Sequence, residues 1–350
     1  MKEYLPWSSE ALNIAKEKYK NGEMSILDIQ LGGRCNNHCQ YCDSPDRNKE
    51  CSIDFNHLYQ LVETATKEGR RFDWVFVSGL GETLFEKNKE HMLFILQMCE
   101  QFNMRCCIFT NGNQMDDEIL DYVGRGILFP NIKIDTFDKH VAAKLYGSSA
   151  SNVDNTFSAM NRLFQLGERD DYLHYHYAAS IVPTKKNYNE IIDIVQQCID
   201  KNMFPLLGEL EFAGLAKEQF ANLYLPEEEL YTLKAEIESL FGPYRIPVCP
   251  SVIAGFHILY NGQIAVDRKS GLSCSWFWLN DPDVIELCNV NSITSFKEAE
   301  VLIFNYRNKA FDNMRQIAAT IRERPFGGCG GNIKDLANEY IELQESLLSK

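Results

Sequence analysis

The stretch Arg34-Cys35-Asn36-Asn37-His38-Cys39-Gln40-Tyr41-Cys42-Asp43-Ser44 decides how the rest of this chain is interpreted. Its cysteines follow a strand-like apolar run and have the spacing C-x3-C-x2-C in a polar loop. Neither a helical nor a strand period fits Cys35, Cys39 and Cys42, so they do not form one buried face. Three thiolates on one loop indicate a metal centre, and an iron–sulfur cluster with three protein ligands keeps one iron open for a small molecule. The alternative is a zinc site that borrows a fourth ligand from His38 or elsewhere.

This loop, with Tyr41 directly before its third cysteine, resembles the cluster-binding signature of the radical S-adenosylmethionine (radical SAM) superfamily. The resemblance implies a [4Fe–4S] cluster on Cys35, Cys39 and Cys42, with S-adenosylmethionine (SAM) on the open iron and Tyr41 beside it. It also implies reductive cleavage of SAM to a 5′-deoxyadenosyl radical, which abstracts a hydrogen atom from substrate. Flavodoxin or ferredoxin is the reductant that such enzymes imply.

A second turn, Ser78-Gly79-Leu80-Gly81-Glu82-Thr83-Leu84, ends the next apolar run. Glycines let backbone approach a ligand, and a carboxylate can receive an ammonium group. The turn is similar to the superfamily's Gly-Gly-Glu-Pro motif, which holds the methionine part of SAM, although Thr83 replaces proline and Leu80 separates the glycines. The cofactor-binding residues that the resemblance implies, including polar residues near later strand ends, are Gly79, Gly81, Glu82, Thr83, Asn111, Asp135, Ser180 and Asn187.

Short apolar runs alternate with helical patterns up to about residue 225, which is the signature of βα units around a parallel sheet. Strands are expected at 26–31, 72–78, 104–110, 131–136, 173–182 and 206–212. The pattern predicts an α/β fold with a partial (β/α)6 barrel over 26–225, after a helical segment at 1–25. Ligands of such folds bind where the strands end, which is where both motifs fall.

Alternation along the expected strands predicts a substrate-facing wall, because alternate residues of a barrel strand point inward. The polar residues that share inward faces are Lys133, Asp135, His174, His176, Ser180, Glu209 and Glu211. Unpaired charges are costly in a dry core, so these residues indicate a wet pocket. His176, Glu209 and Glu211 are the candidate catalytic acids or bases. A one-residue slip in the alternation would instead leave them solvated or salt-bridged.

Composition changes after residue 225, and an Asn261-Gly262 hairpin with flanking helices predicts a small α+β extension over 226–350. Cysteines beside glycine-rich turns suit a cluster site. The region resembles the Twitch or SPASM extensions of radical SAM enzymes, although Asp267 stands where a cysteine is usual. The resemblance implies a second, auxiliary [4Fe–4S] cluster, whose ligands would be Cys249, Cys274, Cys288 and Cys329. Cys288 is alternatively a catalytic hydrogen-atom donor, and the whole region is alternatively an ordinary cap with free thiols.

The net charge of −14 argues against nucleic acid or an anionic membrane as the partner. No apolar run could span a bilayer and the N-terminus lacks a signal-peptide core, so a cytoplasmic protein is expected. Because enzymes with such extensions mostly modify peptides, the resemblance implies crosslinking, epimerisation or oxidation of a ribosomally made peptide. The alternatives are dehydrogenation or epimerisation of a small polar amino sugar or aminocyclitol, and a structural zinc or iron–sulfur module that is not an enzyme.

Overall fold

The computed structural model describes residues 6–42, 48–167, 176–244, 249–273, 283–321, 324–326 and 333–349. Its strands are β1 (Ile26–Leu31), β2 (Trp74–Gly79), β3 (Arg105–Thr110), β4 (Leu128–Lys133), β5 (Ala178–Ile181), β6 (Phe204–Leu207), β7 (Gly255–Ile258), β8 (Gln263–Asp267) and β9 (Val284–Asn289). Within the described residues they form one sheet in the order β6-β5-β4-β3-β2-β1-β7-β8-β9. The strands from β6 to β7 are parallel, and the sheet is open. The predicted α/β class with a partial barrel is confirmed.

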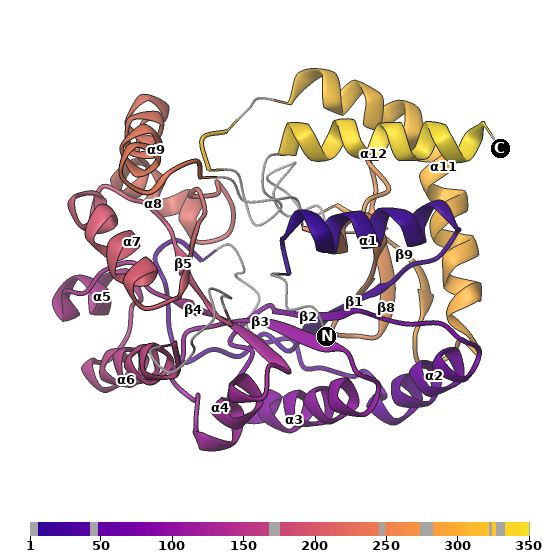
Figure 1. Cartoon of the computed structure of the whole chain (residues 1–350), viewed down its shortest axis with the longest axis horizontal. Helices are drawn as coiled ribbons and strands as arrows, with labels where there is room; N and C mark the ends of the chain where they lie inside the picture. Colours follow the sequence, from indigo (N-terminus) through magenta and orange to yellow (C-terminus); the bar gives the residue numbers. More distant parts are fainter. Residues whose placement is uncertain are drawn as a thin grey trace.

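The helices are α1 (Ser9–Lys20), α2 (Phe55–Lys67), α3 (Glu86–Gln101), α4 (Asp117–Gly124), α5 (Lys139–Leu145), α6 (Ala150–Gly167), α7 (Ile191–Asp200), α8 (Ala216–Leu223), α9 (Glu227–Phe241), α10 (Pro250–Ala254), α11 (Phe296–Thr320) and α12 (Ile333–Leu348). Several begin at side-chain caps: Ser8 accepts from the Ala11 N–H, and Asp54 accepts from the His57 N–H. Helices α2 to α7 cover the outside of the barrel strands (Figure 1).

The segment after residue 250 continues the barrel sheet. Strand β7 pairs in parallel with β1, so Asp28 of β1 lies beside His257 of β7. Strands β8 and β9 then add antiparallel, and the turn between β7 and β8 contains Gly262 at φ +80°. Helices α1, α11 and α12 lie together over this end of the sheet, so that the first and last helices of the described chain are neighbours (Figure 1).

The buried core lies on both faces of the parallel strands. Leu27, Ile29 and Leu31 of β1 are fully buried between the sheet and its outer helices. Trp7 packs edge-to-face on Phe129 of β4 from the inner side, with ring centroids 5.6 Å apart. Within the described residues, no helix combines the length and the apolar character that crossing a bilayer requires.

Some predicted bounds were displaced. The fourth strand was expected at 131–136 but is Leu128–Lys133. The strand tolerates Pro130 because β4 pairs at that residue with β3 alone, and its pairing with β5 begins only at Asn131. The sixth strand was expected at 206–212 but ends at Leu207. Helix α11 is continuous over its 25 residues.

Candidate functional site

A cavity of about 390 Å³ opens at the carboxyl ends of the parallel strands and extends between them. The cysteine loop lines it, together with the Gly81 turn, the inner faces of β1 to β6, the segment that follows β6, and the start of α10. Among the predicted site residues, those that line the cavity are Cys35, Cys39, Tyr41, Cys42, Gly81, Glu82, Asn111, Lys133, Ser180, Glu209, Glu211 and Cys249. Two motifs that are distant in the sequence and part of the expected substrate wall therefore line one cavity.

The cysteine loop is hydrogen-bonded to the backbone at the end of α5. The His38 N–H donates to the Tyr146 carbonyl at 2.8 Å, and the Gln40 N–H donates to the Leu145 carbonyl at 2.9 Å. Gly147 follows at φ +53°, and a Cβ there would stand 2.3 Å from the His38 carbonyl oxygen. Only glycine fits this approach, so the loop has a fixed backbone course rather than a free one.

All three loop cysteines are half-buried and line the cavity. Burial raises the pKa of the Cys39 thiol, while the Lys133 ammonium opposes that rise and the neighbouring Cys42 and Cys35 add to it. Within the described residues, no three His, Cys, Asp or Glu side chains converge as ligands of a single metal ion. A cubane cluster requires its ligands to be farther apart than those of a single metal ion, because each thiolate binds a different iron. Three cysteines around one cavity fit such a cluster better than they fit zinc.

The Gly81 turn packs directly on the backbone before Cys35. A Cβ on Gly81 would stand 2.3 Å from the Gly33 carbonyl oxygen and 2.4 Å from that of Arg34. The Glu82 N–H donates to the Arg34 carbonyl at 2.9 Å. This contact fixes the two motifs relative to each other.

The Glu82 carboxylate is buried and fully engaged. Its Oε1 accepts from the Thr110 hydroxyl and from the Leu84 N–H, and its Oε2 accepts from the Asn111 N–H at 2.7 Å. Burial raises the pKa of this carboxyl, while the donated hydrogen bonds lower it. Thr83, also buried, donates its hydroxyl to the Phe109 carbonyl. These two side chains bind the ends of β2 and β3 together.

Asn111 connects β3 to the cysteine loop. Its Nδ2 donates to Asn36 Oδ1 at 2.7 Å and lies 3.9 Å from Cys35 Sγ. Its Oδ1 accepts from the Asn113 N–H. The amide of Asn111 thus orients the first cysteine of the loop.

Asp135 is fully buried just after β4 and lies beneath Tyr41. It accepts hydrogen bonds from the Tyr41 hydroxyl and the Val182 N–H, and Lys133 Nζ lies 3.2 Å from its Oδ1. The buried Asn187 donates its Nδ2 to the Asp135 carbonyl at 2.8 Å. Asp135 and Asn187 are therefore engaged with the protein and do not line the cavity, whereas Ser180 does.

Glu209 and Glu211 lie beyond the end of β6 and still line the cavity. Glu209 accepts from the Phe326 N–H at 3.0 Å, and Glu211 pairs with Arg324 at 2.6 Å. His176 is half-buried and is not among the lining residues. His174 lies outside the described residues.

Cys249 and Cys288, the C-terminal cysteines that the structure describes, do not share one environment. Cys249 precedes α10, is buried and lines the cavity; burial raises its pKa, and the nearby Asp28 carboxylate adds to that rise. Cys288 is half-buried on β9, where burial raises its pKa, and it is not a lining residue. Cys274 and Cys329 lie outside the described residues.

Inward residues of β1 and β3 were missed from the sequence. Asp28, Gln30 and Cys107 all line the cavity. The signal was present, because Asp28 and Gln30 alternate with Leu27, Ile29 and Leu31 in an otherwise apolar strand.

Residues 29–198 match the family model described as "Radical SAM superfamily". A GTP 3′,8-cyclase of Sulfurovum sp. (strain NBC37-1) is 22% identical over 186 residues, which cover 51% of this chain and 53% of the cyclase. The chain thus spans about half the length of that curated relative.

Two solved structures have a similar fold. Streptococcus suis SuiB bound to precursor peptide SuiA has a TM-score of 0.54 and 15% identity, covering 89% of this chain and 70% of SuiB. Native anSMEcpe with bound AdoMet and Cp18Cys peptide also has a TM-score of 0.54, with 12% identity, covering 93% of this chain and 96% of anSMEcpe.

Proposed function

We propose that the chain, whose residues 29–198 match the radical SAM superfamily model, reductively cleaves SAM and uses the resulting radical to abstract a hydrogen atom from a ribosomally made peptide. The observation that carries the proposal is the single cavity that Cys35, Cys39 and Cys42 share with the Gly81 turn and the inner strand faces. One space can then hold a cluster, SAM and the reacting part of a substrate.

Cys35, Cys39 and Cys42 would hold the cluster, which together with SAM supplies a 5′-deoxyadenosyl radical. Asn111 holds Cys35 through its amide, and Gly147 sets the backbone course of the loop at His38. The backbone at Gly81 lines the cavity where the methionine part of SAM is proposed to bind, and Glu82 keeps that turn in place.

A peptide substrate is the finer part of the proposal. Both similar structures described above contain a bound peptide. The proposed reaction is a crosslink, an epimerisation or an oxidation. The carboxylates Glu209 and Glu211 lie at the cavity wall, where they could take up or release a proton of the substrate.

An auxiliary [4Fe–4S] cluster is a further part of the proposal. Cys249 is its best-placed ligand, because it is the C-terminal cysteine whose side chain reaches the cavity among those that the structure describes. Cys274 and Cys329 would be further ligands, whereas Cys288 lies on β9 and does not line the cavity that Cys249 lines.

Iron, sulfide and 5′-deoxyadenosine, measured after anaerobic reconstitution with a chemical reductant, test the proposal. We expect a Cys35/Cys39/Cys42→Ala triple variant to form no 5′-deoxyadenosine and to keep about half of the wild-type iron. Cys51→Ala is the matched control, since Cys51 is half-buried and does not line the cavity. Wild-type protein that binds zinc and never cleaves SAM would overturn the enzymatic proposal, and complete loss of iron from the triple variant would overturn the auxiliary cluster.

Co-expression with a short peptide encoded beside the gene tests the substrate class by mass spectrometry. A loss of two hydrogens indicates a crosslink or an oxidation, and uptake of deuterium from heavy water indicates epimerisation. An unmodified peptide, together with active SAM cleavage, would favour the amino-sugar alternative.

A further inference from the structure

Strand β1 turns two polar side chains, Asp28 and Gln30, into the cavity. We propose that they form a substrate subsite that binds a primary ammonium group at Asp28 and an adjoining amide at Gln30. The inference rests on the proposed function, because it assigns the substrate of that same cavity: a peptide whose lysine side chain enters the barrel.

Asp28 is a buried carboxylate, with 6% of its surface exposed. Its Oδ2 accepts a hydrogen bond of 2.8 Å from the Ser251 hydroxyl and lies 3.5 Å from His257 Nδ1. Within the described residues, no lysine or arginine pairs with it, and its Oδ1 accepts no hydrogen bond. A buried carboxylate with so little compensation is costly. A cationic donor supplied by the ligand would remove that cost.

Gln30 is a second buried side chain with unused hydrogen-bonding groups. It is 5% exposed, lines the cavity and makes no hydrogen bond through its side chain to another described residue. It follows Asp28 by two residues on the same face of β1, about 7 Å along the strand. Ser78 of β2 is its register partner and lines the same wall. An amide needs both a donor and an acceptor, and the Gln30 side chain offers both.

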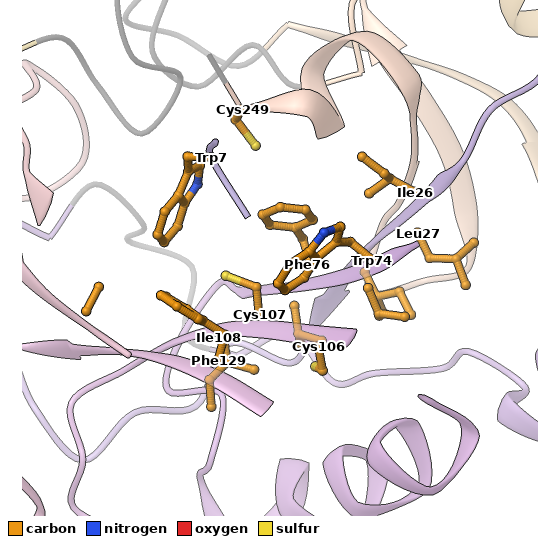
Figure 2. Packing of buried hydrophobic residues seen from close by; sticks show 14 of the residues in the cluster. Trp7, Ile26, Leu27, Trp74, Phe76, Cys106, Cys107, Ile108, Phe129 and Cys249 are labelled. Carbon is orange, nitrogen blue, oxygen red and sulfur yellow. The ribbon is translucent and has the colours of Figure 1, made fainter. Parts of the chain in front are cut away.

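The depth and the walls of this subsite favour a long side chain. Asp28 lies three residues before the end of β1, about 10 Å below the edge where the cysteine loop begins. The side chains of Trp7, Phe76 and Cys107, which lie near one another in Figure 2, line the same cavity as Asp28. Apolar walls and a charged floor suit the four-carbon stem and terminal ammonium of lysine.

Equilibrium binding to the anaerobically reconstituted full-length protein tests the subsite, with Nα-acetyl-lysine-N-methylamide and its norleucine counterpart as probes. The two have similar stems but differ in the ammonium group. We expect wild type to bind the lysine probe about tenfold more tightly than the norleucine probe. Asp28→Asn keeps the shape of the side chain and should bring the ratio close to one. Asp312→Asn, the same change on the exposed face of α11, should leave the ratio as in wild type.

Gln30→Met should weaken the binding of both probes by a similar factor, because it removes the amide contact that they share. Glucosamine and N-acetylglucosamine form a second pair of probes. They test whether the ammonium group belongs to an amino sugar rather than to a lysine side chain. Tighter binding of glucosamine than of the lysine probe, sensitive to Asp28→Asn, would support the subsite and overturn the assignment to lysine.

Equal binding of the lysine and norleucine probes to wild type would overturn the inference. This comparison uses no variant, so it decides the question even if the Asp28→Asn protein misfolds. A lysine preference that survives Asp28→Asn in a folded protein would also overturn it. Because the binding measurement needs no SAM cleavage, absence of 5′-deoxyadenosine would count against the proposed function alone.

Discussion

The backbone of Glu82 is joined to that of Arg34 by a hydrogen bond of 2.9 Å, which connects the turn after β2 to the residue that precedes Cys35. Gly81, next to Glu82, has no room for a side chain, since a Cβ there would stand 2.3 Å from a backbone oxygen. The cysteine loop and the Gly81 turn are therefore packed as one unit, and a substitution that displaces one of them should also displace the other.

Gly81→Ala should lower SAM cleavage by about 10²-fold, because the methyl group would push the turn away from the cysteine loop and misplace SAM. The measurement is the rate of 5′-deoxyadenosine formation at saturating reductant. Gly124→Ala is the control: a Cβ there meets nothing within 4 Å, and cleavage should be unchanged. Wild-type cleavage by the Gly81 variant would show that the close approach is not required.

Glu82→Gln should change how stability depends on pH. Burial raises the pKa of Glu82 above its ordinary value of 4.5, so the folded state holds its proton more tightly than the unfolded state. The free energy of unfolding of wild type, relative to the Gln variant, should therefore fall as pH rises from about 4.5 through the raised pKa, and then level off. Chemical denaturation of both proteins across this range checks the sign, and a difference that grows with pH would contradict it.

Tyr41→Phe should lower the free energy of unfolding by about 1–2 kcal/mol, because it removes a donor from the fully buried Asp135 carboxylate. Urea denaturation measures the change. Tyr59→Phe is the matched control, since the Tyr59 hydroxyl makes no hydrogen bond to another described residue and its ring contacts would be kept. Equal effects of the two substitutions would remove the special role given to Tyr41.

Arg307→Met should destabilise the protein by about 3 kcal/mol, because three buried acceptors lose their donor. Arg307 is fully buried on α11 and donates to the Ile253 carbonyl at 2.6 Å, the Gly271 carbonyl at 3.0 Å and the Ser273 hydroxyl at 2.8 Å. Its loss would leave buried acceptors at the end of α10 without their donor. Arg315→Met, on the same helix, removes a half-exposed pair with Glu345 and a cation–π contact with Phe311, and should cost about 1 kcal/mol. Comparison of the two melting temperatures decides the prediction.

The parts of the fold that could be predicted are those in which local pattern and tertiary environment agree. Strand β1 was expected at 26–31 and a helix within residues 1–25, and both match the structure. The cysteine loop and the Gly81 turn were expected at one edge of the sheet, since parallel strands end together, and both line the cavity. Short elements such as α5 and α10 were not expected, because helices of this length depend on tertiary contacts rather than on their own periodicity.

The chemical roles of polar residues were harder to predict. Alternation correctly grouped Lys133 with Asp135, which form an ion pair, but gave no sign that Asp135 would be buried beneath Tyr41. The roles given to Asp135 and Asn187 stay predictions. Asp28 went unnoticed because its significance depends on Ser251 and His257, which lie more than two hundred residues away in the chain.

The pairing of β1 with β7 has a consequence for synthesis on the ribosome. Until residues 255–258 emerge, β1 has β2 on one side and an unsatisfied backbone edge on the other. A strand edge of that kind invites pairing with another chain, and a pairing so distant in sequence forms slowly. The nascent barrel must therefore be protected from its neighbours until residues 255–258 have been made, and a chain that stops at residue 225 would retain that open edge permanently.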